Sequence, residues 1–177
     1  MADVQAGKRY AQAAFELALR TGDLARWRAD LDDVASVLAE SAAAPILADA
    51  RVPLAQRLTM VERMLDIQPL AVNLAKLLVA KGRAADARAV ANAFNRLADE
   101  HEGIAHASIT TAVPLEADQL AVMETTLGAA LGKRVLATAT VDPGILGGVV
   151  VRVGDRLVDG SVKTRLRRLR LNLEGAR

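Results

Sequence analysis

Apolar residues recur at spacings of three and four through the first hundred residues, and this pattern limits the fold more than any other feature. From Leu24 the positions Trp27, Leu31, Val34 and Leu38 form one buried stripe, and Asp23 before them is a good helix N-cap. Gly22 and Gly82 stop the helices that precede them. Because the connections are short, neighbouring helices should be antiparallel. We predict one bundle of five to six helices over 5–20, 23 onward, 45–48, 53–65, 69–81 and 86–101.

The period changes after Gly103. The β-branched stretch IAHASITTAV predicts a strand that ends at Pro114, and residues 116–131 are helical again. VLATATV, VVVRV and RLV read as three further strands, with Gly154-Asp155 as a two-residue hairpin turn. Ser161 is a fitting N-cap for a last helix. The predicted fold class is therefore α+β: a helical N-terminal bundle, residues 1–103, followed by a small α+β domain, residues 104–177.

Composition excludes several classes of protein. The 177 residues contain no cysteine, so disulfides, thiol catalysis and cysteine metal sites are ruled out. The N-terminus lacks the apolar segment of a signal peptide, and no run reaches the roughly 18 apolar residues that span a bilayer. We expect a soluble, cytoplasmic chain without direct membrane insertion, held at a membrane only by partners if it works there.

The sequence offers no catalytic constellation. His101 and His106 lie at a helix end and in a strand, without the spacing of a metal-binding pair. GAALGKR is one residue short of a phosphate loop and follows a helix, and Gly144, Gly147 and Gly148 lie between two strands. We therefore expect no enzyme, no catalytic residue, no metal and no cofactor.

The C-terminal helix is basic on one side and apolar on another. Val162, Leu166, Leu169 and Leu173 form a stripe that is expected to decide how the helix docks. The cations occupy what remains, and they could form a solvated face, meet an acidic protein partner, or bind nucleic acid or anionic lipid. Single-strand binding normally adds aromatic platforms, which this half of the chain lacks. The cations in question are Lys163, Arg165, Arg167, Arg168 and Arg170.

The stretch VDPGILGGVVVRVGDRLVDGSVKTRLRRLRLNL resembles the C-terminal part of the delta subunit of bacterial F-type ATP synthases, the counterpart of the mitochondrial oligomycin-sensitivity-conferring protein. Upstream, RYAQAAFELA, NLAKLLVAKGR and LADEHEGIAHASITTAVPL resemble further parts of that family in the same order. The motif residues that we expect to shape the fold, not to contact a partner, are Asp142, Gly147, Gly148, Gly154, Asp159, Gly160 and Ser161.

The resemblance implies a non-catalytic stator connector, present once per complex on the cytoplasmic face of the plasma membrane. The helical bundle would hold N-terminal segments of the α-subunits of the catalytic head, and the second domain would hold the C-terminal ends of the b subunits. The candidate groove residues for the α-subunit segment are Tyr10, Ala14, Leu17, Leu74, Leu77 and Leu78. Candidate contacts for acidic residues of the b subunit are Arg165, Arg167, Arg168 and Arg170. The alternative function is an RNA-binding accessory protein that uses the basic C-terminal helix, although the family binds no nucleic acid.

Overall fold

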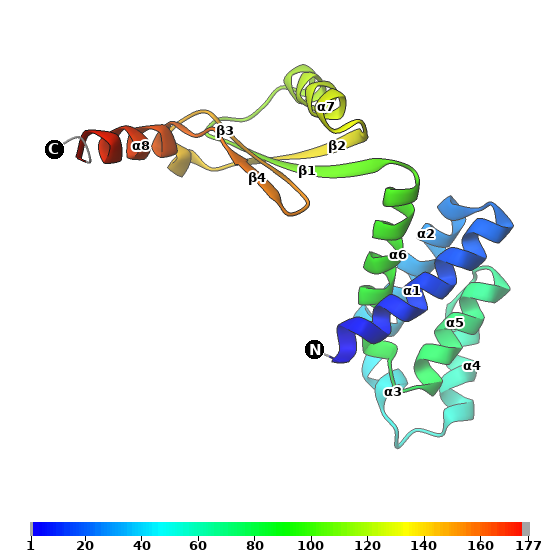
Figure 1. The fold of residues 1–177 in the computed structure, drawn as a ribbon. Helices are drawn as coiled ribbons and strands as arrows, with labels where there is room; N and C mark the ends of the chain where they lie inside the picture. Colours follow the sequence, from blue (N-terminus) through cyan, green and yellow to red (C-terminus); the bar gives the residue numbers. More distant parts are fainter. Residues whose placement is uncertain (1, 175–177) are drawn as a thin grey trace. The chain divides into compact units, whose positions relative to one another are not determined.

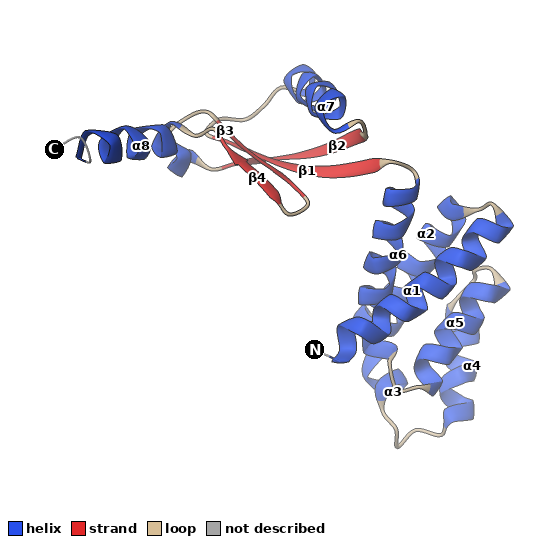
Figure 2. Cartoon of the chain, in the orientation of Figure 1, coloured by secondary structure: helices blue, strands red, loops and turns tan. Residues whose placement is uncertain are grey.

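The computed structural model describes residues 2–174, and its fold is drawn in Figures 1 and 2. The chain divides into two compact units, Met1–Ala98 and Asp99–Arg177. The first unit is helical and the second contains a four-stranded sheet with two helices, which confirms the predicted α+β class.

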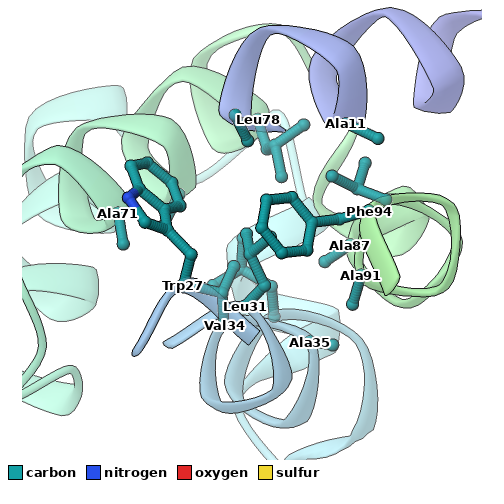
Figure 3. Close-up of a cluster of buried hydrophobic side chains, with 14 of the residues drawn as sticks. Ala11, Trp27, Leu31, Val34, Ala35, Ala71, Leu78, Ala87, Ala91 and Phe94 are labelled. Atoms are coloured by element: carbon teal, nitrogen blue, oxygen red, sulfur yellow. The ribbon is translucent and has the colours of Figure 1, made fainter. Parts of the chain in front are cut away.

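The first unit is a bundle of six α-helices. Its long helices are amphipathic, and their apolar stripes meet in one core. Trp27 and Phe94 are fully buried at its centre with stacked rings 6.3 Å apart, and Leu31 and Leu78 close around them (Figure 3). The helices are α1 (Ala2–Thr21), α2 (Leu24–Ala35), α3 (Ala44–Ala48), α4 (Leu54–Met64), α5 (Pro69–Ala80) and α6 (Ala87–His101).

Helix α1 packs through small side chains. Ala11, Ala14 and Ala18 recur at spacings of three and four, and all three are buried. Alanine leaves little side chain between two helix backbones, so α1 can approach α2 and α5 closely. The scarcity of aromatic residues is thus compatible with a dense core.

Helix α2 passes directly into a π-helical turn, η1 (Ser36–Glu40), which the sequence pattern did not predict. Arg88 of α6 pairs with Asp32 of α2 and with Glu40 of η1, at 2.6 Å for Glu40. The hydrogen bond from the Arg88 guanidinium holds the pKa of Glu40 below its ordinary value. The hydrogen bonds to Glu40 and Asp32 in turn raise the pKa of Arg88. One arginine of α6 therefore contacts residues before and within the π-helical turn. A short 3-10 turn, η2 (Ala84–Asp86), precedes α6.

The second unit is built on a sheet with strand order β2-β1-β3-β4. Strand β1 (Ile104–Thr111) pairs in parallel with β2 (Arg134–Val141) and antiparallel with β3 (Val149–Val153), which forms a hairpin with β4 (Arg156–Asp159). The crossover from β1 to β2 is α7 (Ala117–Leu131). The Ala137 N–H on β2 donates to Glu124 of α7 at 2.7 Å, so α7 covers an amide on the outer strand.

One face of this sheet is the core of the unit. Ala107, Ile109 and Val151 are buried on it, together with Val135 from β2 and Ile145 from the 3-10 turn η3 (Pro143–Ile145). The last helix, α8 (Val162–Glu174), begins one turn after β4 and runs outward from the sheet, well apart from α7 (Figure 1).

Candidate partner-binding surfaces

Helix α5 has an apolar face that the bundle does not cover. Leu70, Leu74 and Leu77, which we call the α5 face, recur at spacings of four and three on one side of the helix. Leu70 is 41% exposed and Leu77 42% exposed, whereas Ala71, Ala75, Leu78 and Val79 on the other side are buried. Leu74 and Leu77, which the sequence predicted as groove residues, therefore lie on the side of the helix that the bundle leaves open. Leu70 was not among the predicted site residues, although its spacing to Leu74 and Leu77 was readable.

Helix α1 packs beside α5 and presents larger side chains at the edge of its alanine face. Tyr10 and Leu17 are half-buried and contact the core cluster, as Leu74 does on α5. Ala14 is 1% exposed and Leu78 is 0% exposed, so both belong to the core and have no surface to offer a partner. Of the six predicted groove residues, four therefore remain as candidate contacts.

The motif residues of the second unit meet where β3, β4 and α8 come together, here called the β3–α8 junction (Gly147, Gly148, Asp159, Gly160, Ser161). The Gly160 N–H donates to Val149 O at 2.9 Å, and the Val162 N–H donates to Gly147 O at 3.0 Å. Gly148 has φ +78°, and a Cβ built there would lie 2.5 Å from Gly160 O. Only glycine permits this approach of two backbone segments.

Asp159 fixes the start of α8. Its carboxylate accepts the Ser161 N–H at 2.9 Å and the Thr164 hydroxyl at 2.7 Å. The backbone hydrogen bond from Ser161, followed by those from the Ser161 and Thr164 side chains, lowers the pKa of Asp159 to about 2. Ser161 caps the helix as predicted, because its Oγ accepts the Thr164 N–H at 3.2 Å.

Asp142 has a similar local role one loop earlier. Its Oδ1 accepts the Gly144 N–H at 2.8 Å and so caps the η3 turn. Together with Asp159, Ser161, Lys163 and Arg167 it borders a pocket of about 310 Å³ beside the junction. Gly154 lies in the β3–β4 turn, as its sequence position predicted.

Helix α8 exposes its cations and also part of its apolar stripe. Lys163, Arg165, Arg167 and Arg168 are all exposed, and the side chain of Arg170 lies outside the described residues. The described members of the apolar stripe are not buried by their own domain, because Val162 is 39% exposed and Leu166 55% exposed. The side chains of Leu169 and Leu173 also lie outside the described residues.

In the part of the chain that the structure describes, no three His, Cys, Asp or Glu side chains gather as metal ligands would. None of the described helices is both long and apolar enough to cross a membrane. His106 on β1 contacts Asp99 at 3.0 Å, which gives this histidine a structural partner.

Comparisons with known proteins agree along almost the whole chain. Residues 6–173 match the family described as ATP synthase delta (OSCP) subunit. An ATP synthase subunit delta of Caulobacter vibrioides is 37% identical over 177 residues, with 97% of this chain and 95% of that protein covered. One of Dehalococcoides mccartyi is 35% identical over 158 residues, covering 89% and 88%. A chain in the Toxoplasma gondii mitochondrial ATP synthase hexamer superposes with a TM-score of 0.65 at 26% identity, covering 94% of this chain and 96% of that one.

Proposed function

Because the chain belongs to the ATP synthase delta (OSCP) subunit family, and is thus a non-catalytic peripheral-stalk subunit of an F-type ATP synthase, we propose that its two domains hold two different partners. Domain 1–103 binds an N-terminal segment of an α-subunit, and domain 104–177 binds the C-terminal end of a b subunit. One copy per complex then keeps the head from turning with the rotor, which couples proton flow to ATP synthesis. The comparisons give no support to the RNA-binding alternative.

The observation that carries this proposal is the uncovered α5 face. An amphipathic partner helix presents apolar anchors at the same three- and four-residue spacings as Leu70, Leu74 and Leu77. Tyr10 and Leu17 on the neighbouring helix α1 are half-buried and are taken as further contacts for the partner helix. Complete burial of a leucine is worth about 1.5–3 kcal/mol, so covering the exposed part of Leu77 contributes roughly 1 kcal/mol.

Binding of a labelled peptide with the sequence of the α-subunit N-terminus tests the head contact. We expect Leu77→Gln to weaken binding about tenfold, which corresponds to about 1.4 kcal/mol. The matched control is Leu19→Gln, because Leu19 is 41% exposed on α1 but lies about 160° around that helix from Leu17. Equal loss in both variants, or no loss in either, would remove the α5 face from the interface.

The stalk contact places the protein on the cytoplasmic face of the plasma membrane as a peripheral subunit. In this arrangement it reaches the membrane through the b subunits and needs no segment of its own in the bilayer. Co-purification from solubilised membranes, scored separately for α and b subunits, tests both contacts at once. Recovery of one partner without the other would show which half of the proposal fails.

A further inference from the structure

Helix α8 is attached to its domain by hydrogen bonds on one side, while its apolar side is left open. The attachment uses Thr164, which is 8% exposed and bonds to Asp159 and Ser161. With 3.6 residues per turn, Val162 and Leu166 each lie about 160° around the helix from Thr164. Leu166 therefore points away from the attachment, and no rotation of α8 can bury it without breaking the junction.

Cations lie on both sides of this open stripe. Lys163 and Arg165 are each about 80° from the line midway between Val162 and Leu166, on opposite sides. Both are exposed. Arg167 and Arg168 lie about 120° and 140° from that line, nearer to Thr164, so they belong to the attachment side and not to the margins. A helix with an apolar centre and two basic margins matches a partner helix with an apolar centre and acidic margins.

Other exposed apolar residues extend this surface beyond the helix. Leu146 is 70% exposed and directly precedes Gly147, and the Val162 side chain lies over Gly147, where a Cβ would be 3.3 Å from Val162 Cγ2. The apolar area thus runs from α8 onto the loop before β3.

We propose that Val162 and Leu166 of α8, continued by Leu146, form the docking surface for an acidic amphipathic helix, and that Lys163 and Arg165 form its rim. The inference rests on the proposed function, because it takes the C-terminal end of the b subunit as the source of that helix. In this arrangement the apolar side chains, and not the arginines expected from the sequence, supply most of the affinity. The cations orient the partner and speed its approach.

The test compares two leucines of nearly equal exposure. Leu166 is 55% exposed on α8 and Leu157 is 56% exposed on β4, so Leu→Gln at either position should leave folding intact. Affinity of the full chain for the soluble part of the b subunit from the same organism is measured by titration calorimetry. We expect Leu166→Gln to weaken binding at least about tenfold and Leu157→Gln to leave it unchanged.

Raising the salt concentration separates apolar from ionic binding. We expect the wild-type Kd to rise only a few-fold between roughly 0.05 and 0.5 M salt, since screening removes the rim contribution and leaves the apolar one. If Leu166→Gln binds normally while Lys163→Gln or Arg165→Gln abolishes binding, the inference is wrong and the stalk contact stands. If the wild-type chain does not bind the b subunit, the proposed stalk contact itself fails. Concentration-dependent dimers that Leu166→Gln disperses would make a second copy the occupant and overturn the inference.

Discussion

Replacing Gly148 by alanine should loosen the attachment of α8 without affecting the helical bundle. Two costs add at this position. An L-residue at φ +78° costs about 1–2 kcal/mol. The new methyl group would also lie 2.5 Å from Gly160 O and 3.2 Å from Ser161 Cα, both backbone atoms that cannot rotate away. Overpacking of this kind costs about 1–3 kcal/mol, so the total is about 2–5 kcal/mol.

Gly132→Ala is the matched control, because it pays only the first of these costs. Gly132 ends α7 at φ +65°, and a Cβ built there meets nothing within 4 Å. The expected loss is about 1–2 kcal/mol. The difference between the two variants therefore measures the clash between Gly148 and Gly160 alone.

Hydrogen exchange, followed by mass spectrometry on peptides that cover β3 and the start of α8, reports the free energy of local opening. Urea unfolding followed by Trp27 fluorescence serves as an internal control, since the chain has one tryptophan and it is buried in the bundle. We expect faster exchange around the β3–α8 junction in Gly148→Ala and an unchanged fluorescence midpoint. Equal effects of Gly148→Ala and Gly132→Ala on exchange would refute the steric argument.

Three further outcomes follow from the geometry. Ala14→Leu should destabilise the bundle by about 1–3 kcal/mol, because the buried face of α1 leaves no room for three more carbons; urea unfolding by Trp27 fluorescence measures it, and an unchanged midpoint would show that α1 can shift. The carboxylate of Asp159 has its pKa lowered from 3.8 to about 2, so its stabilisation is complete above about pH 4 and is lost as pH falls through about 2; the amide resonances of Ser161 and Thr164 should titrate in that range, and Asp159→Asn should abolish the titration. Removal of residues 163–177 should leave the bundle folded and abolish binding to the b subunit, and retained binding would contradict the role given to α8.

Local rules in the sequence predicted most element types and several boundaries. Asp23 caps α2 by accepting the Arg26 N–H at 3.2 Å, and Ser161 caps α8 in the same way. These contacts join residues three apart, so a short stretch of sequence contains both partners. The β3–β4 turn was equally readable, because Gly154-Asp155 joins two apolar runs.

The π-helical turn η1 was not predictable, because its support comes from far along the chain. Arg88 lies 48 residues beyond Glu40, and nothing in the local period of 36–40 departs from an ordinary helix. The open α5 face was predicted only in part, because Leu74 and Leu77 were named and Leu70 was not, and the reason is related. An apolar helix predicts burial, but the sequence does not say whether helices of the same chain suffice to cover it.

For helix α8, the structure decides whether the apolar stripe faces its own domain. Periodicity gave Val162 and Leu166 as the side to be buried, and left open whether the covering surface belongs to the same chain. The deciding information lies in the polar residues. Asp159, Ser161 and Thr164 form hydrogen bonds that settle which side of the helix faces its own domain, and that side is opposite Leu166. When a capping cluster and an apolar stripe lie on opposite sides of a helix, only a surface outside its own domain can cover the stripe.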